Sequence, residues 1–88
     1  LMRLDKFLKV SRLIKRRPLA KQIADQGRIK LNGNIAKAST NVHVGDELEI
    51  GYGHRRLTVK VTLLKEHVKK DEANELYQIV KEEKISQE

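Results

Sequence analysis

The sequence predicts an α+β fold, in which two N-terminal helices pack on a small twisted β-sheet and a C-terminal amphipathic helix completes the domain. Two observations support this prediction. Apolar residues recur at helical spacing at both ends of the chain, and apolar and polar residues alternate between these ends, as in half-buried strands. A chain of 88 residues has the size of one domain with a modest core.

The first helix is expected over residues 3–10, where apolar side chains share one helical face. This apolar stripe consists of Leu4, Phe7 and Leu8. A second helix is expected from Pro18 to Gly27, because proline suits a first helical turn and glycine commonly follows a helix C-terminus. Its apolar stripe consists of Leu19, Ala20, Ile23 and Ala24. Two short helices packed face to face follow from these stripes.

The middle of the chain predicts strands and tight turns. The alternating segments lie at residues 29–31, 34–37, 47–50 and 57–63. Asn32-Gly33 separates the first two, and this dipeptide favours the left-handed backbone of a two-residue hairpin turn. Residues 51–56 are predicted to form a flexible basic loop. The strands would form an antiparallel or mixed sheet.

The C-terminal segment predicts an amphipathic helix at residues 71–83, followed by a frayed tail at 84–88. Its apolar stripe consists of Ala73, Leu76, Tyr77 and Val80. Residues 71–88 contain two Lys and six acids, so this segment carries a charge of −4. An acidic helix of this kind would be repelled by a polyanion and is expected to pack on the sheet.

Positive charge is concentrated in the first third of the chain. Residues 1–30 hold ten Lys or Arg against Asp5 and Asp25, a local balance of +8, whereas the whole chain carries +7. Few acids stand four residues from these bases, so their repulsion would be uncompensated without an anionic ligand. The asymmetry favours a nucleic-acid partner over an ordinary solvated charged face.

Composition argues against several other classes of function. The chain has no Cys, which excludes disulfides and thiolate chemistry and fits a reducing compartment. Three aromatic residues and single, scattered His residues leave little material for an enzyme cleft or a metal site. No segment has the length and hydropathy of a membrane span. We therefore expect a soluble, cytoplasmic protein without cofactor, and we expect Leu1 to be a cloning remnant before a native Met2.

Several motifs together carry a resemblance to a known family. The chain reads R-L-D-K-F-L from Arg3, a basic turn, L-A-K-Q-I-A-D-Q-G-R-I-K-L-N-G, then K-A-S and V-G-D-E-L. In order and spacing these motifs resemble the S4 (alpha-L) type of RNA-binding domain, which occurs in a small-subunit ribosomal protein, pseudouridine synthases and tyrosyl-tRNA synthetases. The resemblance runs from Arg3 to about Ile50. Among free-standing members, the chain most resembles bacterial ribosome quality-control factors related to the fifteen-kilodalton heat-shock protein.

This resemblance implies a non-catalytic RNA-binding factor. Members of the group bind large ribosomal subunits that carry peptidyl-tRNA and contact both ribosomal RNA and tRNA, while a partner factor directs alanine tailing of the stalled chain. We expect an S4-type domain over residues 1–66, with the C-terminal helix and tail of residues 67–88 packed on the same domain, and a monomer. The alternatives are an accessory RNA-binding module of an rRNA-modifying enzyme and a small-subunit ribosomal protein.

The candidate RNA-binding residues lie in the basic first third of the chain and after the hairpin. They are Arg3, Asp5, Lys6, Lys9, Arg12, Lys15, Arg16, Arg17, Lys21 and Lys37. By position, Arg3, Asp5 and Arg17 match the functional signature of the family that the chain resembles. A carboxylate repels phosphate, so Asp5 is expected to orient a nearby Arg or cap backbone before it contacts a base edge. Arg55 and Arg56 are secondary candidates.

Overall fold

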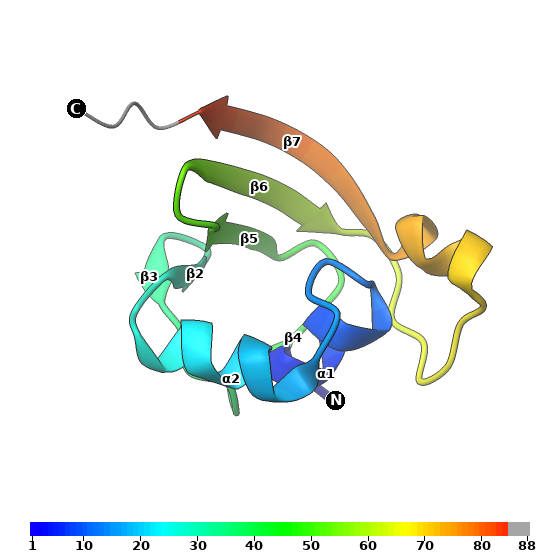
Figure 1. Ribbon diagram of the computed structural model, residues 1–88. Coiled ribbons are helices and arrows are strands. Elements are labelled where there is room, and N and C mark those ends of the chain that lie inside the picture. The colour runs from blue at the N-terminus through cyan, green and yellow to red at the C-terminus, as the bar shows by residue number, and fades with distance from the viewer. Residues whose placement is uncertain (85–88) are drawn as a thin grey trace.

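The computed structural model describes residues 1–84, and in this part of the chain two short α-helices lie together below an antiparallel sheet (Figure 1). In chain order, the elements are β1 (Met2–Arg3), α1 (Leu4–Val10), α2 (Arg17–Asp25), β2 (Ile29–Leu31), β3 (Asn34–Ile35), β4 (Asn41–Val42), β5 (Glu47–Gly51), β6 (Arg55–Val61), the 3₁₀-helix η1 (Lys70–Leu76) and β7 (Tyr77–Lys84). No helix in the described residues combines the length and apolar character that a membrane crossing requires. The α+β class is confirmed.

Both N-terminal helices form close to the expected positions. In α1 the apolar stripe is fully buried and packs on α2, whose buried face contains Ala20, Ile23 and Ala24. Pro18 lies in the first turn of α2, where backbone N–H groups have no intrahelical acceptor, so the N–H that proline lacks is not needed. Gly27 follows α2 with a φ of 74°, a left-handed conformation that glycine adopts without strain. The helices therefore follow directly from local sequence.

The main sheet has the strand order β3-β2-β5-β6-β7 and is antiparallel throughout. The hairpin at Asn32-Gly33 is confirmed, with β2 and β3 paired across it. Alternate residues of β2, β5 and β6 are buried against the helices, among them Ile29, Leu48 and Val59. This alternation leaves the opposite face of the sheet to polar side chains.

A second, two-stranded sheet joins the chain start to the segment after the hairpin. Met2 pairs with Val42 and Arg3 with Asn41. Sequence alternation did not predict this pair, because strands of two residues are too short to show a period. Its effect is to hold the residue that precedes α1 against the body of the domain.

The prediction of a C-terminal amphipathic helix is wrong. Residues of the predicted helix form η1 and then β7, which pairs antiparallel along β6 (Figure 1). Ala73 and Leu76 are buried because residues three apart share one side of a 3₁₀-helix, whereas Val80 is 52 % exposed in the strand. The β-branched pair Ile79-Val80 suits an extended strand, and β7 supplies hydrogen bonds to an edge of β6 that would otherwise be unpaired.

The C-terminal expectations can be compared residue by residue only as far as Lys84, which ends β7. The rest of the expected frayed tail, residues 85–88, lies outside the described residues. The expected basic loop at 51–56 is also shorter than predicted. Gly51 ends β5 and Arg55 begins β6, so only residues 52–54 connect the two strands.

Candidate RNA-binding surface

Asp5 lies at the centre of a cluster with two arginines at the start of the helical pair. Its side chain is 5 % exposed, and its two carboxylate oxygens accept hydrogen bonds from Arg3 at 3.3 Å and from Arg17 at 3.4 Å. The side chains of Arg3 and Arg17 are 50 % and 44 % exposed. One buried carboxylate therefore holds two guanidinium groups that still face solvent.

The electrostatics of this cluster favour the ionised carboxylate. Burial raises the pKa of Asp5, but hydrogen bonds from Arg17 and Arg3 together with their charges lower it more, so the pKa lies below its ordinary value of 3.8. Asp5 also accepts a hydrogen bond of 2.8 Å from the backbone N–H of Lys6. Both expected roles of Asp5, orienting an Arg and capping backbone, are thus present in its contacts.

The segment after the hairpin packs against the same end of α1. The backbone N–H of Leu4 donates to the carbonyl of Thr40 at 2.8 Å, and that of Asp5 donates to the carbonyl of Ala38 at 3.1 Å. These bonds satisfy amides that a helix N-terminus leaves without partners. They also bring the exposed Lys37, 32 residues after Asp5 in the sequence, onto the segment beside the cluster.

The turn between the helices carries exposed cations on a braced backbone. Lys15 and Arg16 are exposed, whereas Ile14 in the same turn is only 3 % exposed and is part of the core. From the other side, the Tyr52 hydroxyl donates to the carbonyl of Leu13 at 2.9 Å, and burial raises the pKa of Tyr52. The turn is therefore held at two points while its charged side chains stay in solvent.

Arg12 occupies a backbone conformation that is unusual for its residue type. Its φ of 63° lies in the left-handed region, just after α1, where glycine or asparagine is the common residue. A non-glycine residue in this region costs on the order of 1 kcal/mol or more. The Arg12 side chain is exposed at this position, beside the other cations of the turn.

The remaining basic residues of α1 lie beside the segment that follows β6. The Lys6 ammonium forms an ion pair with Glu66, whose pKa this contact lowers. Lys9 and Arg12 line a hollow of about 130 Å³ together with residues 66–68. Lys6 therefore has an acidic partner in the structure, whereas Lys21 is exposed on α2 without an ion pair among the described residues.

The secondary candidates have acidic partners on β7. Arg55 pairs with Glu82 at 2.8 Å, and its guanidinium lies 5.1 Å from the centre of the Tyr52 ring. Arg56 pairs with Glu83 at 3.7 Å. Both acids belong to β7, which the sequence had predicted to be helical, so these pairs were not foreseeable from the sequence.

Sequence reasoning also missed two supporting residues. Tyr52 braces the basic turn from a distant loop, and Glu66 competes for Lys6 from 60 residues away. The sequence signal that could have indicated a structural role for Tyr52 is that the chain has only three aromatic residues. No local signal pointed to Glu66, because the contact depends on how the segment after β6 folds back.

A rigid helical pair that presents clustered arginines to solvent can bind the phosphates and stack on the bases of structured RNA. This fold and this surface define a small RNA-binding domain. Comparison with known families agrees, since the family model of the S4 domain matches residues 2–48, more than half of the chain.

Relatives of known name cover almost the whole chain. The RQC P-site tRNA stabilizing factor of Bacillus subtilis is 62 % identical over 86 residues, which are 98 % of this chain and 100 % of the relative. The factor of the same name from Streptococcus pneumoniae is 51 % identical over 98 % of this chain and 98 % of its own. The trimeric structure of Vibrio cholerae heat shock protein 15 has a TM-score of 0.84 and 31 % identity, covering 90 % of this chain and 81 % of that one. The chain belongs to the S4 domain family and, within it, to the family of the RQC P-site tRNA stabilizing factors.

Proposed function

We propose that this protein is a non-catalytic factor that binds large ribosomal subunits carrying peptidyl-tRNA, contacts rRNA and tRNA, and stabilises the tRNA in the P-site during quality control of stalled chains. The printed name of relatives at 51–62 % identity over nearly the full chain supports this function. In this function the protein would support alanine tailing by a separate partner factor. It would act as a monomer in the cytoplasm.

The observation that carries the proposal is the Asp5 cluster. A factor that stabilises a tRNA gains affinity when its cations are held in place before binding, because ordering a long side chain on binding costs about 0.5–1.5 kcal/mol. Asp5 holds Arg3 and Arg17 in this way while leaving about half of each side chain exposed. The pair is therefore ready to bind phosphates without further ordering.

The proposed RNA-binding surface extends from this cluster over the basic turn. It includes Arg12, Lys15, Arg16, Lys21 and, across the β1–β4 side, Lys37. Lys9 would contribute from the solvent side of α1, and Lys6 would contribute once RNA displaces Glu66. Arg55 is a weaker candidate because its charge is paired with Glu82 at 2.8 Å, whereas Arg56 has only a longer contact of 3.7 Å with Glu83.

The test is capture of ribosomal particles from cells with tagged wild-type protein, Arg17→Ala and Arg55→Ala. The wild type is expected to recover large subunits loaded with tRNA. Arg17→Ala should reduce that recovery much more than Arg55→Ala, because only Arg17 belongs to the Asp5 cluster.

Other outcomes would identify the alternative functions. Equal recovery of small subunits or whole ribosomes, without enrichment of tRNA-loaded large subunits, would indicate a structural ribosomal protein. Recovery of free rRNA precursors with a modifying enzyme would indicate an accessory module. Equal loss for the two variants would move the main contact to β6.

A further inference from the structure

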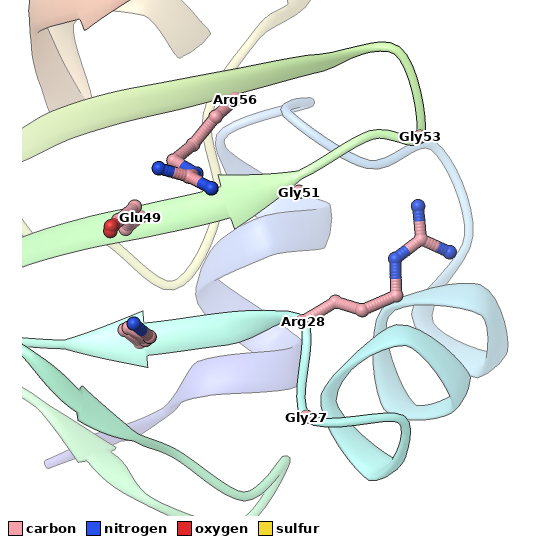
Figure 2. A pocket seen from close by; sticks show the side chains of 7 residues that line it. Gly27, Arg28, Glu49, Gly51, Gly53 and Arg56 are labelled. Atoms are coloured by element: carbon pink, nitrogen blue, oxygen red, sulfur yellow. The ribbon is translucent and has the colours of Figure 1, made fainter. Parts of the chain in front are cut away.

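A groove of about 420 Å³ lies at the C-terminal end of α2, at the opposite end of that helix from Arg17 (Figure 2). Three cationic side chains, those of Arg28, Lys30 and Arg56, line it together with Glu49 and three glycines. The lining contains no aliphatic or aromatic residue, so the groove offers no anchor for an apolar ligand.

Arg28 runs past two of the glycines that line the groove. In Figure 2 its side chain runs from the start of β2 towards the turn that contains Gly53. A Cβ on Gly51 would lie 3.4 Å from the Arg28 carbonyl and 4.0 Å from its Nε, and a Cβ on Gly53 would lie 3.7 Å from Nη2. The Arg28 side chain therefore lies in van der Waals range of both turn positions.

The partner of Arg28 is a neutral amide. Its Nη1 donates to Gln26 Oε1 at 3.2 Å, and Arg28 forms no ion pair with any carboxylate in residues 1–84. An oriented guanidinium that keeps its full charge is suited to bind phosphate oxygens.

The other charges of the groove leave it net positive. Lys30 lies opposite Glu49 in the β2–β5 register but forms no ion pair of 4.0 Å or less in the described part of the chain. Arg56, whose side chain points across β5 in Figure 2, has only a long contact of 3.7 Å with the half-exposed Glu83. Exposed pairs of this kind contribute little, so Arg56 can exchange its partner for a phosphate at small cost.

We propose that this groove binds the phosphodiester backbone of a second RNA segment, with Arg28 as its main contact. The inference rests on the proposed function, in which the protein contacts two RNAs. From Arg17 to Asp25 the helix rises about 12 Å, so no single phosphate reaches both ends. The three cations of the groove can contact phosphate oxygens, and the absence of an apolar anchor disfavours a peptide.

The test measures equilibrium binding of the full chain to protein-free large-subunit rRNA, to tRNA and to intact tRNA-loaded large subunits over a series of salt concentrations. The variants are Arg28→Gln, Arg28→Lys and a matched control, Lys70→Gln, which removes one exposed charge in η1. Arg28→Gln is expected to weaken binding about three- to tenfold and to reduce the salt slope by about 0.7–0.9 in one RNA arm, and that arm identifies the RNA. Arg28→Lys should keep the slope but lose part of the affinity, and the control should change neither.

A second variant keeps every charge. Gly51 has no left-handed φ, so Gly51→Ala fits the backbone but places a methyl group against Arg28. At these distances the methyl group does not displace the arginine, so the variant is expected to keep the affinity and the melting temperature of the wild type and serves as a control that leaves every charge in place. In the double variant Arg17→Gln/Arg28→Gln, the losses of binding free energy of the two single variants should add, because the two sites are far apart.

The outcomes separate this inference from the proposed function. If wild-type protein binds tRNA-loaded subunits while Arg28→Gln equals Lys70→Gln in affinity and slope, the groove proposal is overturned and the function stands. If Arg28→Gln weakens binding to intact subunits but to neither protein-free RNA, the groove meets an acidic protein surface and the RNA proposal is overturned. If wild-type protein does not bind tRNA-loaded subunits, the proposed function fails.

Discussion

Replacing Asp5 by Asn separates the orientation of arginines from simple attraction between charges. The substitution keeps the size of the side chain and raises the net charge from +7 to +8. Simple attraction to RNA would therefore increase. However, the neutral amide has one acceptor oxygen where the carboxylate has two, and it repels one of the two guanidinium groups through its own N–H donors.

The magnitude follows from the exposure of the partners. Exposed ion pairs contribute about 0–1 kcal/mol and broken buried pairs cost about 3–5 kcal/mol, so a buried Asp with half-exposed arginines lies between them, at about 2 kcal/mol. In a domain of this size that loss lowers the melting temperature by roughly 8–16 °C. Releasing two arginines costs about 1–3 kcal/mol of ordering on binding, and we expect about tenfold weaker binding after the gain of one charge.

The assay is binding to tRNA-loaded large subunits at a temperature where both proteins are folded. Asp25→Asn is the matched control, because Asp25 is exposed on α2, has no ion pair in residues 1–84 and gives the same change of net charge. The control should bind as well as the wild type or slightly more tightly. If Asp5→Asn binds as the control does, Asp5 does not orient the arginines for RNA and the reasoning is refuted.

Three further predictions concern stability as well as binding. The folded pKa of Asp5 lies below 3.8, so the stabilisation from its carboxylate is present above that value and is lost as pH falls through the folded pKa. The free energies of unfolding of wild type and Asp5→Asn, measured in urea, should therefore differ at pH 7 and converge in strong acid. An equal difference at both pH values would contradict this assignment. Arg12→Gly should raise the free energy of unfolding by about 0.5–1 kcal/mol, because glycine adopts the positive φ without strain. The same substitution should weaken RNA binding, because it removes a cation. A loss of stability would show that Arg12 is not strained. Leu76→Ala should lower the free energy of unfolding by about 2–5 kcal/mol, because Leu76 is fully buried in the same core as the helices. Unfolding should remain one cooperative transition. A separate early transition would instead show that the C-terminal segment unfolds alone.

Local pattern predicted the helices and the hairpin well. The stripe of Leu4, Phe7 and Leu8, Pro18 at the start of α2 and the Asn32-Gly33 turn each act over a few residues. Such features need no distant partner, and each appears in the structure where the sequence placed it. The concentration of positive charge in the first third likewise required only the sequence.

The C-terminal segment shows where local pattern fails. Ala73, Leu76, Tyr77 and Val80 have helical spacing, but β6 has an edge whose backbone groups need partners. Hydrogen bonds along that edge favour the extended conformation over the weak helical preference of the segment. The sequence window does not contain β6, and therefore it could not predict β7.

The candidate site divides in the same way. The sequence by itself determined which residues are basic and that Arg3, Asp5 and Arg17 stand near helix starts. Only the tertiary structure decided that one buried carboxylate orients both arginines, that Glu66 pairs with Lys6, and that Arg28 keeps its charge in a glycine-lined groove. Side-chain type and helical periodicity are local properties, whereas the pairing of charges depends on which distant segments the folded backbone brings within a few ångströms.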